Sequence, residues 1–199
     1  VEAVAGTGAR IYDTRKTTPG WRRLVKYAVR CGGGWNHRSA LHDAVLIKDN
    51  HLALGADTEV DGPTSGRFSP AEAVAKARRF LQEHGSEAGE MIVEIEVDSL
   101  DQLDEVLPAA PDLILLDNMP PAVLREAVTR RNACKASIEL EASGGVNLET
   151  VTEIARAGVD RISVGALTHS ARCLDVALDW LPELELGVRP HPSSPVFTP

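Results

Sequence analysis

The chain has 199 residues, of which 43% are hydrophobic and 25% charged, as is ordinary for one soluble globular domain with a sizeable core. Its formal net charge of −8 argues against general nucleic-acid binding, and no apolar run approaches the roughly 20 residues that a membrane-spanning helix needs. The three cysteines, Cys31, Cys134 and Cys173, fit neither a disulfide framework nor a zinc cluster, so the sequence predicts a reducing, cytoplasmic location.

Short apolar runs alternate with helical patterns along the chain. The runs predicted as strands cover residues 9–14, 44–50, 91–99, 113–118, 137–143 and 161–167. The segments predicted as helices cover residues 21–31, 69–85, 99–108, 120–133, 147–158 and 171–181. The helix that starts at Ser69 has the clearest signals, because Ser69 can cap it, Pro70 suits its first position and Glu72 its first turn. Strands that alternate with helices indicate a parallel sheet covered by helices.

The sheet could close into an α/β barrel or stay open and doubly wound. Polar or charged residues stand at or near the C-terminal end of nearly every predicted strand. Barrels assemble their sites at that end from many strands, whereas open sheets concentrate ligand groups at one switch point. We therefore predict a parallel α/β barrel whose roughly six strand-helix units leave it incomplete or smaller than eight. This domain is predicted over residues 1–181, with a surface loop over residues 53–69 and a Pro-rich extension over residues 182–199.

Positive charge gathers near the start of the chain. Between Arg10 and Lys48 there are nine Lys or Arg and two acids, so this segment carries +7 and the remainder −15. Such a segment indicates a small anionic ligand, although a solvated basic face would give the same pattern. The candidate ligand groups in it are Arg15, Lys16, His37, Arg38 and Lys48. Five groups exceed what one phosphate needs, and they suit a ligand with several carboxylates or a pyrophosphate.

Acidic residues recur on the later strands. Glu94 and Glu96 stand two apart, so they share one face of a strand, and Asp117 and Glu141 lie near the ends of two further strands. Carboxylates on an apolar strand are costly unless they are paired or hold a cation. They could bind Mg²⁺, accept hydrogen bonds from sugar hydroxyls, steady a developing cation, or form salt bridges inside the domain.

Small residues follow the last two predicted strands. The candidate phosphate-binding residues there are Ser143, Gly144, Gly145, Gly165 and Ala166. Small residues expose backbone N–H groups, the start of a following helix adds positive partial charge, and barrels often bind phosphate at these two loops. His169 could lie beside such a site or merely cap the next helix. Lys48 could alternatively form a Schiff base, but the clustered arginines argue against this role.

Seven motifs together resemble one enzyme family. In chain order they are DTRKTTPG, GGGWNHR, LIKDNH, EIEVDS, LLDN, EASGG and VGALTHS. They are similar, over residues 8–179, to the quinolinate phosphoribosyltransferases, also called nicotinate-nucleotide pyrophosphorylases. The resemblance implies that nicotinate mononucleotide, pyrophosphate and CO₂ are made from quinolinate and phosphoribosyl pyrophosphate with Mg²⁺. It also implies a homodimer or higher homo-oligomer, and an N-terminal α+β domain that has no counterpart in these 199 residues.

The resemblance assigns roles to the candidate residues. The residues implied to grip the quinolinate carboxylates are Arg15, His37, Arg38 and Lys48, with Lys16 near the substrate and pyrophosphate. Glu96 and Asp117 are implied to hold the ribose hydroxyls and Mg²⁺, and Glu141 lies on the same acidic floor. The residues implied to bind the 5′-phosphate are Ser143, Gly144, Gly145, Gly165 and Ala166, with His169 beside them. The implied catalytic residues are Lys16, Lys48, Glu96 and Asp117.

Two other functions fit the same residues. One is a truncated or non-catalytic relative that binds a pyridine carboxylate or a sugar phosphate without turnover. The other is an enzyme that keeps phosphoribosyl transfer but accepts a different pyridine acid, because pocket shape decides between related acids.

Overall fold

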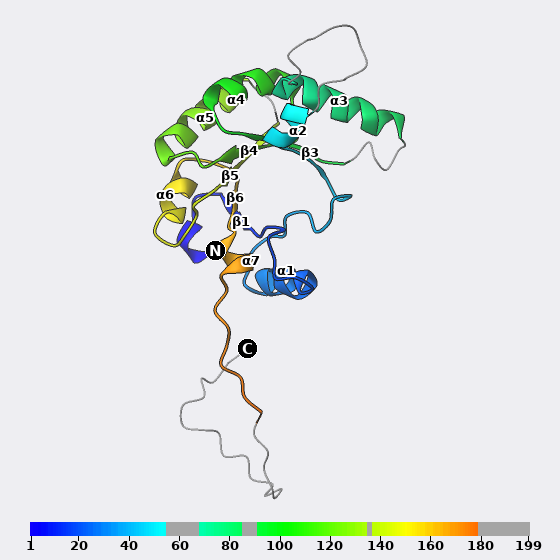
Figure 1. Cartoon of the computed structure of the whole chain (residues 1–199). Helices are drawn as coiled ribbons and strands as arrows, with labels where there is room; N and C mark the ends of the chain where they lie inside the picture. Colours follow the sequence, from blue (N-terminus) through cyan, green and yellow to red (C-terminus); the bar gives the residue numbers. More distant parts are fainter. Residues whose placement is uncertain (55–67, 85–90, 135–136, 179–199) are drawn as a thin grey trace, which may run out of the picture.

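The computed structural model describes residues 1–54, 68–84, 91–134 and 137–178, and it contains one parallel sheet. The strands are β1 (Arg10–Tyr12), β2 (Val45–Ile47), β3 (Val93–Val97), β4 (Leu113–Asp117), β5 (Glu139–Ser143) and β6 (Arg161–Ser163). Their order in the sheet is β1-β6-β5-β4-β3-β2. Figure 1 shows that the strands follow one another around a common axis, with helices on the outside. The predicted parallel α/β architecture is confirmed, as an incomplete barrel.

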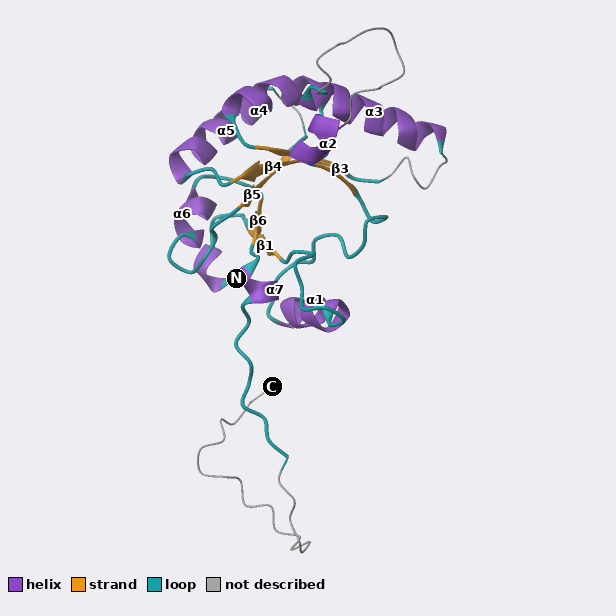
Figure 2. Cartoon of the chain, viewed as in Figure 1, coloured by secondary structure: helices purple, strands orange, loops and turns teal. Residues whose placement is uncertain are grey.

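Each strand is followed in the chain by at least one α-helix, and the helices lie outside the ring of strands in space (Figure 2). The α-helices are α1 (Arg22–Cys31), α2 (Asp49–Leu54), α3 (Pro70–Glu83), α4 (Leu100–Val106), α5 (Pro121–Ala133), α6 (Val151–Arg156) and α7 (Ala166–His169). Two short 3-10 helices, η1 (Glu2–Val4) and η3 (Leu107–Ala109), complete the described elements. Among the described residues, no helix has the length and apolar character needed to cross a bilayer.

The edges of the sheet are β1 and β2, and the segment between them spans the gap. The backbone N–H of Trp35 donates to Ile11 O at 2.8 Å, and the N–H of Asp13 donates to Trp35 O at 3.0 Å. The chain therefore pairs briefly with β1 before it crosses to β2. The core lies between the strands and the inner faces of the helices, where Ile95, Ile114 and Leu140 are fully buried.

Helix α3 begins as the sequence predicts. The Ser69 hydroxyl accepts from the N–H of Glu72, and the Glu72 carboxylate accepts from the N–H of Ser69, which makes a capping box. Ser69→Ala should lower the free energy of unfolding by about 1 kcal/mol in urea titrations. Ser137→Ala, at an exposed serine outside any described helix, is the control and should change it little. Equal effects of the two substitutions would mean that the cap does not stabilise the helix.

Several predicted segments differ from the structure. The strand predicted over residues 161–167 ends at Ser163, and Ala166–His169 form α7. The strand predicted over residues 44–50 ends at Ile47, and α2 begins at Asp49.

The loop expected from residue 53 begins later, because α2 continues to Leu54 and packs the buried Leu52 against the core; residues 55–67 lie outside the described part. The helix predicted over residues 171–181 is wrong for its described residues 171–178, which have no regular secondary structure. Leu174 and Leu178 are 86% and 102% exposed there, and a short helix without apolar packing is not stable in water. Residues 179–199, which include the predicted extension, are not described.

Candidate active site

A cavity of about 880 Å³ lies at the carboxyl ends of the strands. Residues at or just after the end of every strand of the sheet line it, from Thr14 after β1 to Ser163 on β6. The predicted site residues that line it are Arg15, Lys16, His37, Arg38, Lys48, Glu96, Asp117, Ser143, Gly144, Gly145, Gly165, Ala166 and His169. The topology thus brings together side chains that are far apart in the sequence, because parallel strands present their carboxyl ends at one edge.

One wall of the cavity is cationic. Arg15 and Lys16 follow β1, Arg38 lies on the segment that crosses the gap, and Lys48 follows β2. Burial, followed by the positive charge of Arg15, lowers the pKa of Arg38. The Nε atoms of Arg15 and Arg38 are buried and have no hydrogen-bond acceptor among the described residues. Two crowded guanidinium groups with unused donors are suited to bind an anionic ligand.

The facing wall is acidic. Glu96 lies on β3 and Asp117 ends β4. Lys48 forms an ion pair with Glu96, so the two walls are in contact, and the Asn118 side-chain N–H donates to Asp117 at 2.8 Å. Both acids line the cavity, and carboxylate oxygens are the ligands that Mg²⁺ prefers in proteins. Glu96 and Asp117 therefore fit a Mg²⁺ site, with further ligands to come from water or substrate.

Glycines after β5 allow a tight loop beside the acidic wall. Gly144 and Gly145 have φ angles of +93° and +61°, which favour glycine. A Cβ atom on Gly144 would lie 2.1 Å from the side-chain oxygen of Asn118, so the loop packs against the end of β4. The helix predicted from Asn147 starts later, because α6 begins only at Val151, so its N-terminal end lies further from the glycines than expected. After β6, α7 has only four residues, so its partial charge contributes little.

Gly144→Ala tests this packing. We expect it to lower the free energy of unfolding by at least about 1 kcal/mol, because alanine is strained at this φ and Asn118 must move. Urea titration measures the effect. Gly145→Ala is the control, because it is strained in the same loop but meets nothing within 4 Å. If the two variants lose equal stability, the contact with Asn118 is unimportant.

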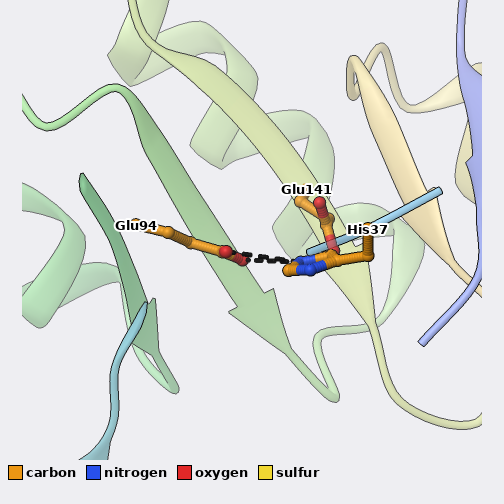
Figure 3. A group of neighbouring side chains, drawn as sticks. All are labelled: His37, Glu94 and Glu141. Atoms are coloured by element: carbon orange, nitrogen blue, oxygen red, sulfur yellow. Dashed lines mark hydrogen bonds and ion pairs between the residues drawn. The ribbon is translucent and has the colours of Figure 1, made fainter. Parts of the chain in front are cut away.

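Two buried carboxylates and one partly buried histidine lie close together beside the cationic wall, and Figure 3 shows them. His37 Nε2 lies 3.3 Å from the Glu94 carboxylate and 3.5 Å from that of Glu141. Glu141 is fully buried, accepts a hydrogen bond from the Ser163 hydroxyl and does not line the cavity. The predicted direct contact of Glu141 with substrate is therefore unsupported. Burial, followed by the charge of Glu94, raises the pKa of Glu141 to about 7.

The hydrogen bonds of His37 decide what its ring can do. The N–H of Arg38 donates to His37 Nδ1 at 2.9 Å, so the ring proton lies on Nε2 and points to the carboxylates. Metal binding by Nε2 would need this arrangement to break, so the His37, Glu94 and Glu141 group does not favour a metal. Burial lowers the pKa of His37, but the hydrogen bond and charge of Glu94 outweigh it, and the pKa is raised. Both ring nitrogens thus have protein partners, and His37 has no free donor for a substrate.

Two supporting side chains were not among the residues assigned to the site from the sequence. Asp13, at the end of β1, is fully buried and pairs with the buried Lys26 of α1 at 2.5 Å. Asp13 could have been found from the sequence, because it is a polar residue at the end of a predicted strand. Nothing in the helical pattern distinguishes Lys26 from the exposed Arg23 nearby. A buried lysine is recognised only when the packing of its helix is known.

Comparison with known proteins identifies the family. The family described as "Quinolinate phosphoribosyl transferase, C-terminal domain" matches residues 1–179. The chain belongs to this family. Among named members of the quinolinate phosphoribosyl transferase family, the chain is 48% identical to the nicotinate-nucleotide pyrophosphorylase [carboxylating] of Mycobacterium leprae over 179 residues, 90% of this chain. It is 43% identical to the probable enzyme of that name from Bacillus subtilis over 171 residues, 85% of this chain.

Solved structures of the quinolinate phosphoribosyl transferase family share the fold. The nicotinate-nucleotide pyrophosphorylase of Francisella tularensis is 38% identical, with a TM-score of 0.69 over 84% of this chain and 52% of that one. NadC from Streptococcus pyogenes is 36% identical, with a TM-score of 0.71 over 87% of this chain and 54% of that one. The chain spans about half the length of its relatives, 56% of the M. leprae protein and 52% of the B. subtilis protein.

Proposed function

We propose that this chain carries the catalytic domain for phosphoribosyl transfer from phosphoribosyl pyrophosphate to quinolinate, with decarboxylation, in NAD biosynthesis. The observation that carries the proposal is the pair Arg15 and Arg38, whose buried Nε donors have no acceptor among the described residues. Quinolinate has two neighbouring carboxylates, and arginine binds carboxylates with parallel hydrogen bonds. The relatives' printed names and the position of the pair in one cavity with acids and glycines support the same reaction.

The cationic wall is the proposed quinolinate site. Arg15, Arg38 and Lys48 bind its two carboxylates, and Lys16 lies on the same wall for the pyrophosphate of the second substrate. His37 supports this wall from below, because its ring nitrogens are already bonded to Arg38 and the buried acids. Mutual repulsion between Arg15 and Arg38 is relieved when an anion binds, which favours a doubly charged acid over a singly charged one.

The acidic wall and the glycine loop are the proposed site for phosphoribosyl pyrophosphate. Glu96 and Asp117 would accept hydrogen bonds from the ribose hydroxyls and would hold Mg²⁺, which would supply positive charge to the leaving pyrophosphate. The residues proposed to surround the 5′-phosphate are Ser143, Gly144, Gly145, Gly165, Ala166 and His169. A Cβ on Gly165 would lie 2.9 Å from His169 Nε2, so this glycine lets the imidazole approach the loop.

The reaction needs positioning and electrostatics rather than a covalent enzyme intermediate. The quinolinate ring nitrogen bonds to ribose C1 while the bond from C1 to pyrophosphate oxygen breaks, and pyrophosphate departs with that electron pair. Glu96 and Asp117 stabilise the positive charge that develops on the ribose. The bond from ring carbon 2 to its carboxylate then breaks, CO₂ leaves, and a proton takes the electron pair left on carbon 2.

Several further features belong to the proposal. A homodimer or higher homo-oligomer is supported by exposed apolar side chains on and beside α1, where Trp21, Leu24 and Tyr27 are 60%, 59% and 69% exposed. A reducing cytoplasmic location is supported by the three cysteines, which are free and exposed. The alternative function is ligand binding without turnover.

Turnover with quinolinate, phosphoribosyl pyrophosphate and Mg²⁺ tests the proposal through pyrophosphate release. We expect release from the complete gene product that contains this chain, and loss of release when a chelator removes Mg²⁺. Release that persists in the chelator would contradict the role of Mg²⁺. Binding of quinolinate without any pyrophosphate release would favour the non-catalytic alternative over the enzyme.

A further inference from the structure

We propose that the buried ion pair between Asp13 and Lys26 positions residues 35–38, the clamp segment, so that Arg38 faces quinolinate. This inference rests on the proposed function of the cationic wall. The first residue of the clamp segment, Trp35, pairs with β1, and residues 36–38 then cross the gap toward β2 and belong to no described strand. The clamp segment therefore needs another means of holding His37 and Arg38 at the cavity.

Asp13 uses both carboxylate oxygens to hold the segment. Oδ1 accepts from Lys26 Nζ at 2.5 Å and from the backbone N–H of His37 at 2.8 Å. Oδ2 accepts from the Asn36 side-chain N–H at 2.7 Å. Asp13 is fully buried at the end of β1, so these bonds are shielded from water. They tie two consecutive residues of the clamp segment, Asn36 and His37, to the residue that directly follows β1.

Lys26 holds the same segment from α1. Its Nζ donates to His37 O at 2.7 Å as well as to Asp13, and its own carbonyl accepts from the Asn36 side chain at 2.9 Å. The backbone of His37 is thus fixed at both its N–H, by Asp13, and its carbonyl, by Lys26. A single ion pair therefore sets the path of the chain through His37.

The fixed path of His37 determines where Arg38 lies. The N–H of Arg38 donates to His37 Nδ1 at 2.9 Å, and its guanidinium Nη1 donates to Ala44 O at 2.9 Å. These bonds leave the buried Nε of Arg38 without an acceptor in the described part of the chain, on a side chain that lines the cavity. Asp13 and Lys26 do not line the cavity themselves, so they act through Arg38 and are positioning residues.

Stability alone does not account for this pair. Removing two charges from water is costly, and replacing a buried ion pair by apolar residues is often neutral or stabilising. An apolar pair, however, could neither accept a hydrogen bond from the His37 N–H nor donate one to the His37 carbonyl. The structure therefore assigns the pair to the geometry of the clamp segment more than to the stability of the fold.

The double variant Asp13→Asn/Lys26→Met tests the assignment, because it removes both charges without leaving one of them buried and unpaired. The matched control is Asp160→Asn/Arg131→Met. That pair is also close, at 2.7 Å, and also fixes backbone, since Asp160 accepts from Leu140 N–H and Arg131 donates to Ile138 O. Neither Asp160 nor Arg131 lines the cavity.

Two measurements on the complete gene product separate the outcomes. We expect the Asp13/Lys26 variant to bind quinolinate at least about tenfold more weakly by calorimetry, with unchanged affinity for phosphoribosyl pyrophosphate. Amide hydrogen exchange at His37 should become faster in this variant and not in the control. Quinolinate affinity within twofold of the unsubstituted protein, or equal losses for both ligands, would overturn the proposal. If the unsubstituted protein binds no quinolinate, the proposed function fails, while exchange at His37 still reports whether the pair orders the segment.

Discussion

Arg38→Ala should weaken quinolinate binding by about 10- to 100-fold, the range for losing a charge-assisted bidentate contact. The reason is that Arg38 lines the cavity beside Arg15 and has a buried donor without an acceptor among the described residues. Calorimetric titration with quinolinate measures the loss. Arg38→Lys should recover part of the affinity, because it restores the charge but not the planar fork of donors.

The matched control for Arg38 is Arg23→Ala, an exposed arginine on α1 that does not line the cavity. It should leave quinolinate affinity within about twofold, because an exposed charge that does not line the cavity is largely screened by salt. If Arg38→Ala binds quinolinate as tightly as Arg23→Ala does, the cationic wall is not the carboxylate site.

Glu141→Gln should raise the free energy of unfolding above pH 7, relative to the unsubstituted protein. Burial, with the charge of Glu94, raises the pKa of the Glu141 carboxyl from 4.5 to about 7. A group whose folded pKa is raised stabilises the fold below its unfolded pKa, and that contribution is lost as pH rises through the folded pKa. The unsubstituted protein should therefore lose up to about 3 kcal/mol of unfolding free energy from this group between pH 4.5 and pH 8.

Urea titrations at a series of pH values check the Glu141 prediction. Glutamine keeps the shape of the side chain and cannot ionise, so the Glu141→Gln curve should lack most of this decline. Glu153→Gln, on the exposed face of α6, should follow the unsubstituted protein. Parallel pH curves for all three proteins would show that Glu141 does not carry a raised pKa.

Much of the site could be predicted because parallel strands end at one edge. Lys48, Glu96 and Asp117 each stand at or just beyond a strand end in the sequence, and the sheet brings all three to one cavity. The alternation of strand and helix predicted a parallel sheet, but it did not by itself place β1 beside β6. The start of α3 was readable from Ser69 and Glu72 because a capping box is local in sequence.

The errors have physical reasons as well. Alternation along β5 places Glu139 and Glu141 on one face, but it does not show how deeply each side chain is buried. In the fold, Glu139 pairs with Arg10, whereas Glu141 is fully buried. The ring nitrogens of His37 are engaged by groups on other segments, which a loop sequence cannot reveal. Apolar residues at 174 and 178 suit a helix by spacing, but together with Val176 they also alternate, and the segment is not helical.

Measuring carbon dioxide and pyrophosphate in the same reaction tests whether the protein transfers phosphoribosyl to quinolinate with decarboxylation. Quinolinate labelled with carbon-13 in the carboxylate beside the ring nitrogen is mixed with phosphoribosyl pyrophosphate, Mg²⁺ and the complete gene product. We expect one labelled CO₂ for each pyrophosphate, formed only when both substrates are present, and at least about tenfold slower formation with Arg38→Ala at limiting quinolinate. Pyrophosphate without labelled CO₂, or neither product, would contradict this expectation.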